Sequence, residues 1–238
     1  MTSAVTPTPT YERKRGELET YFDRTAADAW AKLTSDAPVS GIRATVRAGR
    51  DAMRATLLDW LPQDLSGRRI LDAGCGAGQL SIEAAARGAD VVAIDLAGTL
   101  VRLAEERFSP SLVPGSIEFR VGDMFDPALG QFDHVVAMDS VIHYSARDIT
   151  DILSGFAERT ERSLLFTFAP RTPALTVMHA AGKLFPRSDR SPAIQPVSEA
   201  HLRKLIGQAN ALAGWGPAQT RRIKSGFYFS QAMELTPA

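Results

Sequence analysis

The pattern of apolar and polar positions changes character near residue 65. Before it, apolar residues recur at helical spacing, whereas after it short, nearly unbroken apolar runs alternate with helical segments. The runs predict strands over 70–73, 90–95, 116–121, 132–138 and 162–168. The segments between them predict helices over 78–87, 100–108 and 147–158. Unbroken apolar strands separated by helices indicate a parallel sheet covered on both faces.

This alternation of strands and helices stops at Pro170. Residues 170–197 contain five prolines and exceed the length of an ordinary connection, so they predict an inserted cap. A helix is expected over 198–208. Two further strands, 218–224 and 227–235, flank a tight turn and predict an antiparallel finish. The expected fold class is therefore α/β and Rossmann-like, with a mostly parallel seven-stranded sheet whose last strand is antiparallel.

The N-terminal part of the chain reads differently from the rest. Residues 1–10 are rich in Thr and Pro and predict a disordered tail. Residues 11–64 predict a helical arm in front of a core formed by 65–238. From Gly41 the arm carries an apolar stripe and a basic stripe at helical spacing. The basic stripe consists of Arg43, Arg47, Arg50 and Arg54. It predicts either a solvated helix face or a grip on a carboxylate, for which Arg43 is the candidate because it lies nearest the turn at Gly41.

Composition excludes several classes of function. Lys and Arg number 27, as do Asp and Glu, so the net charge is zero and bulk binding to nucleic acid is not indicated. Cys75 is the single cysteine, which excludes an intrachain disulfide and a multi-cysteine metal cluster. The chain shows neither a signal pattern nor an apolar run of membrane-spanning length. We therefore expect a cytoplasmic protein, with any membrane contact being peripheral.

The strand predicted at 70–73 runs directly into a turn containing Gly74, Gly76 and Gly78. Such a turn presents backbone N–H groups and the positive end of a helix to a ligand. A dinucleotide fingerprint needs the spacing G-x-G-x-x-G, whereas this turn has G-x-G-x-G. In addition, Asp72 inside the strand would repel a pyrophosphate and suits a ligand that carries an ammonium group.

Two more acidic residues stand where the next strands end. Asp95, followed by Leu96, is placed to accept hydrogen bonds from both hydroxyls of a ribose. Asp123 can accept a hydrogen bond from an adenine amino group, with Met124 against the ring. An ammonium group, a ribose and an adenine together describe S-adenosyl-L-methionine (SAM), the methyl donor.

Residues 70–139 resemble the class I SAM-dependent methyltransferases, whose first motif matches 72–78. The resemblance implies the class I methyltransferase fold and SAM as cofactor. The second acidic residue of this methyltransferase family matches Asp95. The strand predicted at 132–138 is followed by Asp139, which we place with the cofactor-binding residues, and by the turn 139–144. This turn lacks the Asn/Asp-Pro-Pro-aromatic motif of enzymes that methylate planar amines.

His143 lies in the same turn, where an acceptor should meet the methyl group. It can orient an oxygen nucleophile or take a proton. The alternative interpretation is that His143 only caps or packs at the end of a strand. Tyr21 has a similar pair of readings. It can close the donor pocket from the arm and align the acceptor, or it can be a core aromatic residue.

Four segments and Trp30 resemble the magnesium-protoporphyrin IX methyltransferases of chlorophyll and bacteriochlorophyll synthesis, and the segments are 19–23, 40–53, 60–62 and 139–144. The resemblance implies methyl transfer from SAM to a propionate carboxylate of magnesium protoporphyrin IX, giving a monomethyl ester. His143 would then hold that carboxylate or face the magnesium. Arg43 would grip the carboxylate of SAM or the second propionate. No protein-bound metal is expected, since the porphyrin carries the magnesium, and the large subunit of magnesium chelatase is an implied partner.

Three alternative functions stay open at this stage. One is a SAM-dependent O-methyltransferase with another apolar small molecule as acceptor. A second is an NAD-dependent oxidoreductase, which Asp72 and the glycine spacing disfavour. The third is a SAM-binding or porphyrin-carrying module, which would bind its ligand without forming a product.

Overall fold

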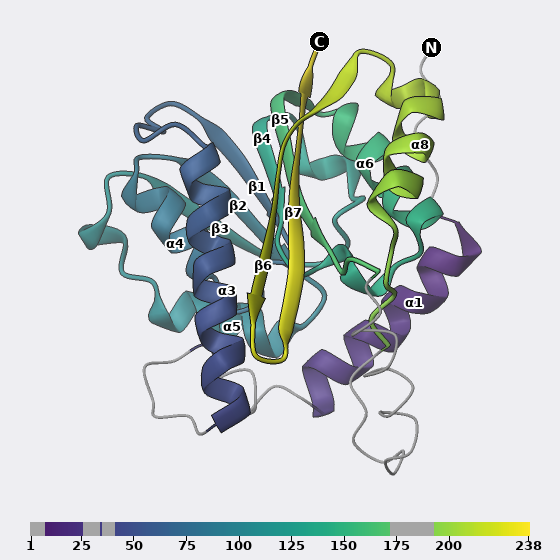
Figure 1. Ribbon diagram of the computed structural model, residues 1–238. Coiled ribbons are helices and arrows are strands. Elements are labelled where there is room, and N and C mark those ends of the chain that lie inside the picture. The colour runs from purple at the N-terminus through teal and green to yellow at the C-terminus, as the bar shows by residue number, and fades with distance from the viewer. Residues whose placement is uncertain (1–7, 26–33, 35–40, 172–192) are drawn as a thin grey trace.

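The computed structural model describes residues 8–25, 34, 41–171 and 193–238. Its centre is a seven-stranded sheet with the strand order β3-β2-β1-β4-β5-β7-β6 (Figure 1). The strands are β1 (Arg69–Ala73), β2 (Asp90–Asp95), β3 (Ser116–Val121), β4 (Phe132–Ala137), β5 (Thr160–Phe168), β6 (Trp215–Ser225) and β7 (Tyr228–Pro237). Strands β1 to β5 run parallel, whereas β7 runs antiparallel to both of its neighbours, β5 and β6. The predicted fold class, with its antiparallel last strand, is confirmed.

Helices cover both faces of this sheet (Figure 1). On one face, α3 (Gly41–Trp60) and α4 (Gln79–Ala86) pack on apolar side chains of β1, β2 and β7, and α5 (Gly98–Arg107) lies along β2 and β3. On the other face, α1 (Pro9–Thr20), α6 (Ala146–Ala157) and α8 (Glu199–Gln208) enclose a larger apolar cluster. Short turns complete the chain: η1 (Tyr21–Thr25), η2 (Pro110–Leu112), η3 (Pro127–Leu129), η4 (Val141–His143) and η6 (Asn210–Leu212). None of the described helices is long and apolar enough to cross a membrane.

The elements predicted from residue 70 onward begin and end within three residues of those found. For the central strands β1, β2 and β4 the reason is that unbroken apolar runs mark strands buried on both faces, and the fully buried Ile70 and Leu71 of β1 illustrate this. The arm helix expected from Gly41 is also present as α3, which buries Met53 and Leu57 of its apolar stripe. Ile42, at the start of that stripe, is exposed.

The boundary of the N-terminal tail differs from the prediction. Helix α1 begins at Pro9, so residues 8–10, which the sequence assigns to a disordered tail, belong to an ordered helix start. The Thr8 side chain accepts a hydrogen bond from the backbone N–H of Tyr11 at 3.2 Å and thereby caps the helix. Pro9 suits the first helical position because its fixed φ is helical and its missing N–H is not needed there. Residues 1–7 lie outside the described residues.

Most of the predicted cap, residues 172–192, also lies outside the described residues. Its two ends are described and meet just beyond the carboxyl end of β5. The Arg171 N–H donates to the carbonyl of Val197 at 2.9 Å, and the Val197 N–H donates to the carbonyl of Ala169 at 2.8 Å. The returning chain then contacts the turn η4, since the Gln195 N–H donates to the carbonyl of Ile142 at 2.9 Å.

Candidate active site

A cavity of about 660 Å³ opens at the carboxyl ends of β1, β2 and β4. This edge of a parallel sheet is where ligands bind in open α/β folds. Its walls come from the loop after β1, the turn after β4, helix α3 and the hairpin of β6 and β7. Most of the predicted site residues line it: Asp72, Gly74, Gly76, Asp95, Leu96, Met124, Asp139 and His143. Four do not belong to its lining: Gly78, Asp123, Arg43 and Tyr21.

The loop after β1 has the left-handed conformation that its glycines allow. Gly74, Gly76 and Gly78 have φ values of 87°, 53° and 75°. Asp95 at the end of β2 holds the loop, because its carboxylate accepts hydrogen bonds from the N–H of Gly76 at 2.8 Å and of Ala97 at 2.9 Å. Gly78 does not line the cavity. A Cβ there would lie 2.9 Å from the Cβ of Ala104, so this glycine lets the start of α4 approach α5.

Asp72 is almost completely buried beneath this loop. Its Oδ2 accepts a hydrogen bond of 2.6 Å from the Ser81 hydroxyl. Burial, together with the nearby carboxylate of Asp95, raises the pKa of Asp72 to about 7, despite the hydrogen bond from Ser81. Burial likewise raises the pKa of Asp95. Two carboxyl groups that are costly to ionise on their own make this end of the cavity a good site for a cationic ligand.

Asp123 lies outside the cavity lining because helix α1 holds its side chain. The Tyr11 hydroxyl donates to Asp123 Oδ1 at 2.7 Å, and Arg15 forms an ion pair with Oδ2 at 2.8 Å. The neighbouring Gly122 and Met124 line the cavity, as does Tyr11. The predicted bond between Asp123 and an adenine therefore stays a prediction, and Tyr11 is a site residue that sequence reasoning missed.

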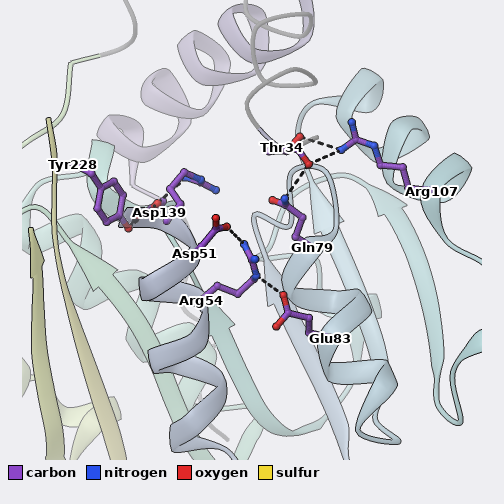
Figure 2. A network of polar contacts seen from close by, with 9 residues as sticks. Thr34, Asp51, Arg54, Gln79, Glu83, Arg107, Asp139 and Tyr228 are labelled. Atoms are coloured by element: carbon purple, nitrogen blue, oxygen red, sulfur yellow. Dashed lines mark hydrogen bonds and ion pairs between the residues drawn. The ribbon is translucent and has the colours of Figure 1, made fainter. Parts of the chain in front are cut away.

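Asp139, which lines the cavity at the turn after β4, is the centre of a polar network, and Figure 2 draws part of it. It has a φ of 53°, a strained value for a residue with a side chain. Arg50 of α3 forms an ion pair of 2.6 Å with Asp139 Oδ2. Three hydroxyl groups also donate to the carboxylate, those of Thr167, Tyr228 and Ser230, at 3.0 to 3.2 Å. The charge of Asp139 is thus stabilised from β5, β7 and α3 at once.

The arginines of the basic stripe that line the cavity lie further toward the C-terminal end of α3 than the predicted Arg43. Arg43 lies exposed in the first turn of α3, away from the cavity lining, so its selection as the carboxylate grip is not supported by the geometry. Arg50 and Arg54 line the cavity instead. Arg54 is held by Asp51 at 3.0 Å and by Glu83 of α4 (Figure 2). Which arginine lines the cavity depends on its position along α3, since Arg43 lies about two turns before Arg50.

The rings near His143 come from two segments of the arm. His143 is buried on η4, and its ring centroid lies 5.9 Å from that of Phe22. Phe22 lines the cavity, whereas Tyr21 does not and packs edge-on against Phe22 at 5.1 Å. Tyr11 of α1 stacks on Tyr144 at 5.2 Å. Neighbouring residues of a helical turn point in different directions, so the sequence alone does not tell which of Tyr21 and Phe22 faces the ligand.

Two further contacts close the walls of the cavity. The backbone of Thr34 accepts hydrogen bonds from Gln79 at 2.9 Å and Arg107 at 3.2 Å, so the arm passes close to the start of α4 (Figure 2). Phe227 and Phe229 of the hairpin line the opposite part, a contribution that the sequence analysis did not identify. Among the described residues, no group of three His, Cys, Asp or Glu side chains is placed to hold a metal ion.

Comparison with known proteins identifies the family. The family model described as "Magnesium-protoporphyrin IX methyltransferase C-terminus" matches residues 137–237, and a general "Methyltransferase domain" model matches 70–162. A magnesium-protoporphyrin O-methyltransferase from Rhodobacter capsulatus is 48% identical over 228 residues, which are 95% of this chain and 98% of that protein. The chain belongs to the magnesium-protoporphyrin O-methyltransferase family. The resemblance seen in the sequence is thereby confirmed.

A solved structure and a more distant relative complete the comparison. The magnesium protoporphyrin IX methyltransferase of Synechocystis with bound S-adenosylhomocysteine (SAH) superposes with a TM-score of 0.79 at 30% identity, covering 94% of this chain and 100% of that one. A ubiquinone biosynthesis O-methyltransferase from Xanthomonas oryzae is 33% identical over 204 residues, 82% of this chain and 77% of that protein. Both models cover the turn η4, whereas only the general methyltransferase model covers the glycine loop and only the model specific to the magnesium-protoporphyrin O-methyltransferase family covers the hairpin.

Proposed function

We propose that this chain transfers the methyl group of SAM to a propionate carboxylate of magnesium protoporphyrin IX, giving the monomethyl ester in (bacterio)chlorophyll biosynthesis. The observation that carries the proposal is the 48% identity with the Rhodobacter capsulatus enzyme over almost the full length of both chains. The cavity fits the reaction. Its donor end has buried carboxyl groups, and its acceptor side has arginines among apolar and aromatic side chains.

SAM supplies an electrophilic methyl group on a positively charged sulfur. The chain's residues fit this cofactor at three points. Asp72 offers a buried carboxylate to its ammonium group, and Asp95, already accepting from the loop, offers carboxylate oxygens to the ribose. Leu96 and Met124 line the part of the cavity where an adenine ring would pack. Gly76 leaves room, since nothing lies within 4 Å of a Cβ built on it.

The acceptor needs little chemical activation. A propionate with a carboxylate pKa near ~4 is ionised at neutral pH and needs no strong base. The task of the protein is to align the carboxylate with the methyl group and to exclude water, effects worth roughly 7–11 kcal/mol in well-aligned cases. We assign alignment to His143, which is buried at the cavity wall and either holds the carboxylate or faces the magnesium. For Tyr21 we propose closure over the donor pocket, which requires the turn η1 to rotate because Phe22 faces the cavity.

Two associations belong to the same proposal. The porphyrin is poorly soluble in water because of its large apolar ring, so delivery by the large subunit of magnesium chelatase, or contact with a membrane surface, would keep it from aggregating. We therefore propose a cytoplasmic protein with peripheral membrane contact. The exposed Ile42 and Phe227 at neighbouring ends of α3 and the hairpin are compatible with such a contact.

One assay tests the proposed function. Purified protein is incubated with SAM and either magnesium protoporphyrin IX or metal-free protoporphyrin IX, and products are identified by mass spectrometry. We expect the monomethyl ester from the magnesium porphyrin. No ester from either porphyrin would overturn the proposal and favour an O-methyltransferase with another apolar acceptor, such as a quinone precursor, since the Xanthomonas oryzae relative is named for ubiquinone biosynthesis.

A further inference from the structure

Ser140 carries a buried hydroxyl group whose surroundings are unusual. Among the residues that the structure describes, its Oγ has no hydrogen-bond partner, although it is shielded from solvent. It stands at the cap position of η4, but its side chain does not cap that turn. A buried hydroxyl without a partner is destabilising. Because Ser140 also lines the cavity, the missing partner is best supplied by a ligand.

The position of Ser140 indicates where the ligand group that bonds to its hydroxyl would lie. A Cβ built on Gly74 would be 3.1 Å from the Ser140 hydroxyl, so Ser140 stands directly against the glycine loop of the donor side. It also follows Asp139, whose strained backbone directs the chain into η4. Ser140 is therefore at the boundary between donor and acceptor, where the methyl group must change partners.

The charges around this boundary favour a carboxylate. Arg50 and Arg54 are the cationic side chains among the described residues of the cavity lining, and Arg50 is paired with Asp139. The planar guanidinium of arginine matches a carboxylate better than any other side chain does. Asp139 is also stabilised by three hydroxyl donors from β5 and β7. Arg50 can therefore share its charge with an incoming anion while Asp139 keeps its other donors.

We propose that Ser140 and Arg50 form the subsite for the reacting propionate, with the Ser140 hydroxyl donating a hydrogen bond to the carboxylate and Arg50 providing the counter-charge. This inference rests on the proposed function. The hydroxyl binds the carboxylate oxygen that does not react. The other oxygen forms the new bond to the methyl carbon while the bond between sulfur and that carbon breaks. The electron pair of the broken bond stays on sulfur, and no proton is transferred.

The test compares wild type with Ser140→Ala and with the control Ser116→Ala, which removes an exposed hydroxyl bonded to Asp90 at the start of β3. Binding of magnesium protoporphyrin IX and of its dimethyl ester is followed by fluorescence, SAH binding by calorimetry, and stability by thermal unfolding. For Ser140→Ala we expect about tenfold weaker binding of the free acid, the effect of one hydrogen bond to a charged group. Binding of the dimethyl ester and of SAH should be unchanged, and the unfolding midpoint should not fall.

Three results would overturn the inference. Equal binding of the free acid by wild type and Ser140→Ala removes the hydroxyl from the acceptor site. Weaker SAH binding with unchanged porphyrin binding assigns the hydroxyl to the carboxylate of the cofactor. A lower unfolding midpoint gives Ser140 a purely structural role. Failure of the proposed function is distinguishable from these results, because the wild type would then form no ester. The comparison of porphyrin and SAH binding would still decide the role of Ser140.

Discussion

The hydroxyl of Tyr11 donates a hydrogen bond of 2.7 Å to Asp123, which joins the first helix of the arm to the end of β3. Thr10 makes a second bond of this kind to Asp148 of α6, also at 2.7 Å. Both acceptors are carboxylates of the core, and both donors are hydroxyl groups in the first turns of α1. The arm is thus fixed to the core at two points, the loop after β3 and helix α6.

Tyr11→Phe should lower stability while preserving the ring contacts with Phe125 and Tyr144. A hydrogen bond to a charged group is worth about 1.5–3 kcal/mol, which corresponds to an unfolding midpoint lower by roughly 3–12 °C for a chain of this size. The control is Arg15→Gln, because Arg15 is half exposed and such ion pairs contribute at most about 1 kcal/mol. Differential scanning calorimetry measures both. Equal effects of the two variants would contradict the importance of the Tyr11 hydroxyl.

Asp72 should make stability depend on pH. Its pKa is raised from 3.8 to about 7, so between these pH values the folded chain holds a proton that the unfolded chain has lost. The free energy of unfolding therefore falls as pH rises through this window. Asp72→Asn removes the cost of ionising a buried carboxyl group. The variant should therefore have a higher unfolding midpoint than wild type at pH 8 and nearly the same midpoint near pH 4. An Asn variant that is less stable than wild type at pH 8 would contradict this.

The same carboxyl group should couple ligand binding to proton release. An ammonium group placed against Asp72 favours its ionised form, so SAH binding should strengthen by up to about tenfold per pH unit between pH 6 and 7 and level off above. Calorimetry in buffers of different ionisation enthalpy counts the protons released. In Asp72→Asn both the pH slope and the affinity at pH 8 should be reduced. Tight, pH-independent binding by this variant would remove Asp72 from the ammonium site.

Gly49→Ala should disturb the contact between α3 and the hairpin. A Cβ at Gly49 would lie 2.7 Å from Cγ and 2.8 Å from Cβ of Tyr228, whose hydroxyl bonds to Asp139. Overpacking of this kind costs about 1–3 kcal/mol. The matched control is Gly16→Ala in α1, where nothing lies within 4 Å and a gain of about 0.5–1 kcal/mol is expected. Urea titration measures both changes, and two changes of the same sign would contradict the model of this contact.

His143→Ala should slow turnover by about 10²-fold, because an acceptor that is not held in line with the methyl group reacts far more slowly. SAH affinity should stay close to that of wild type, since His143 lies on η4 and not on the glycine loop that we assign to the cofactor. His201→Ala on the exposed face of α8 is the control. Steady-state kinetics and calorimetry provide the two measurements. Turnover at the wild-type rate would leave His143 as a packing residue.

The lining that comes from the carboxyl ends of β1 and β2 could be predicted from the sequence because its residues are close along the chain. Asp72 and the glycines after β1 form one local motif, and Asp95 follows at the end of the next strand. The wall that α3 and the hairpin form depends on contacts between distant segments. That Arg50 rather than Arg43 reaches the cavity is decided by where α3 crosses the hairpin, and the aromatic side chains at 227–229 enter only through this crossing.

In the arm, the start of α1 could be predicted from the sequence, whereas the aromatic residue that faces the cavity could not. Thr8 followed by Pro9 is a recognisable helix start, so the order of residues 8–10 could have been predicted from these two residues. The choice between Tyr21 and Phe22 could not, because both are aromatic and adjacent. Which ring faces the cavity depends on the rotation of η1 against His143.

The paired ends of the insertion make it an exchangeable part of the molecule. Hydrogen bonds between Ala169, Arg171 and Val197 hold these ends together whatever lies between them. Closing a loop that is twice as long costs only about 0.6 kcal/mol more. A connection of another length or sequence can therefore join the same two ends, while the register of β5 against β4 and β7 remains as it is.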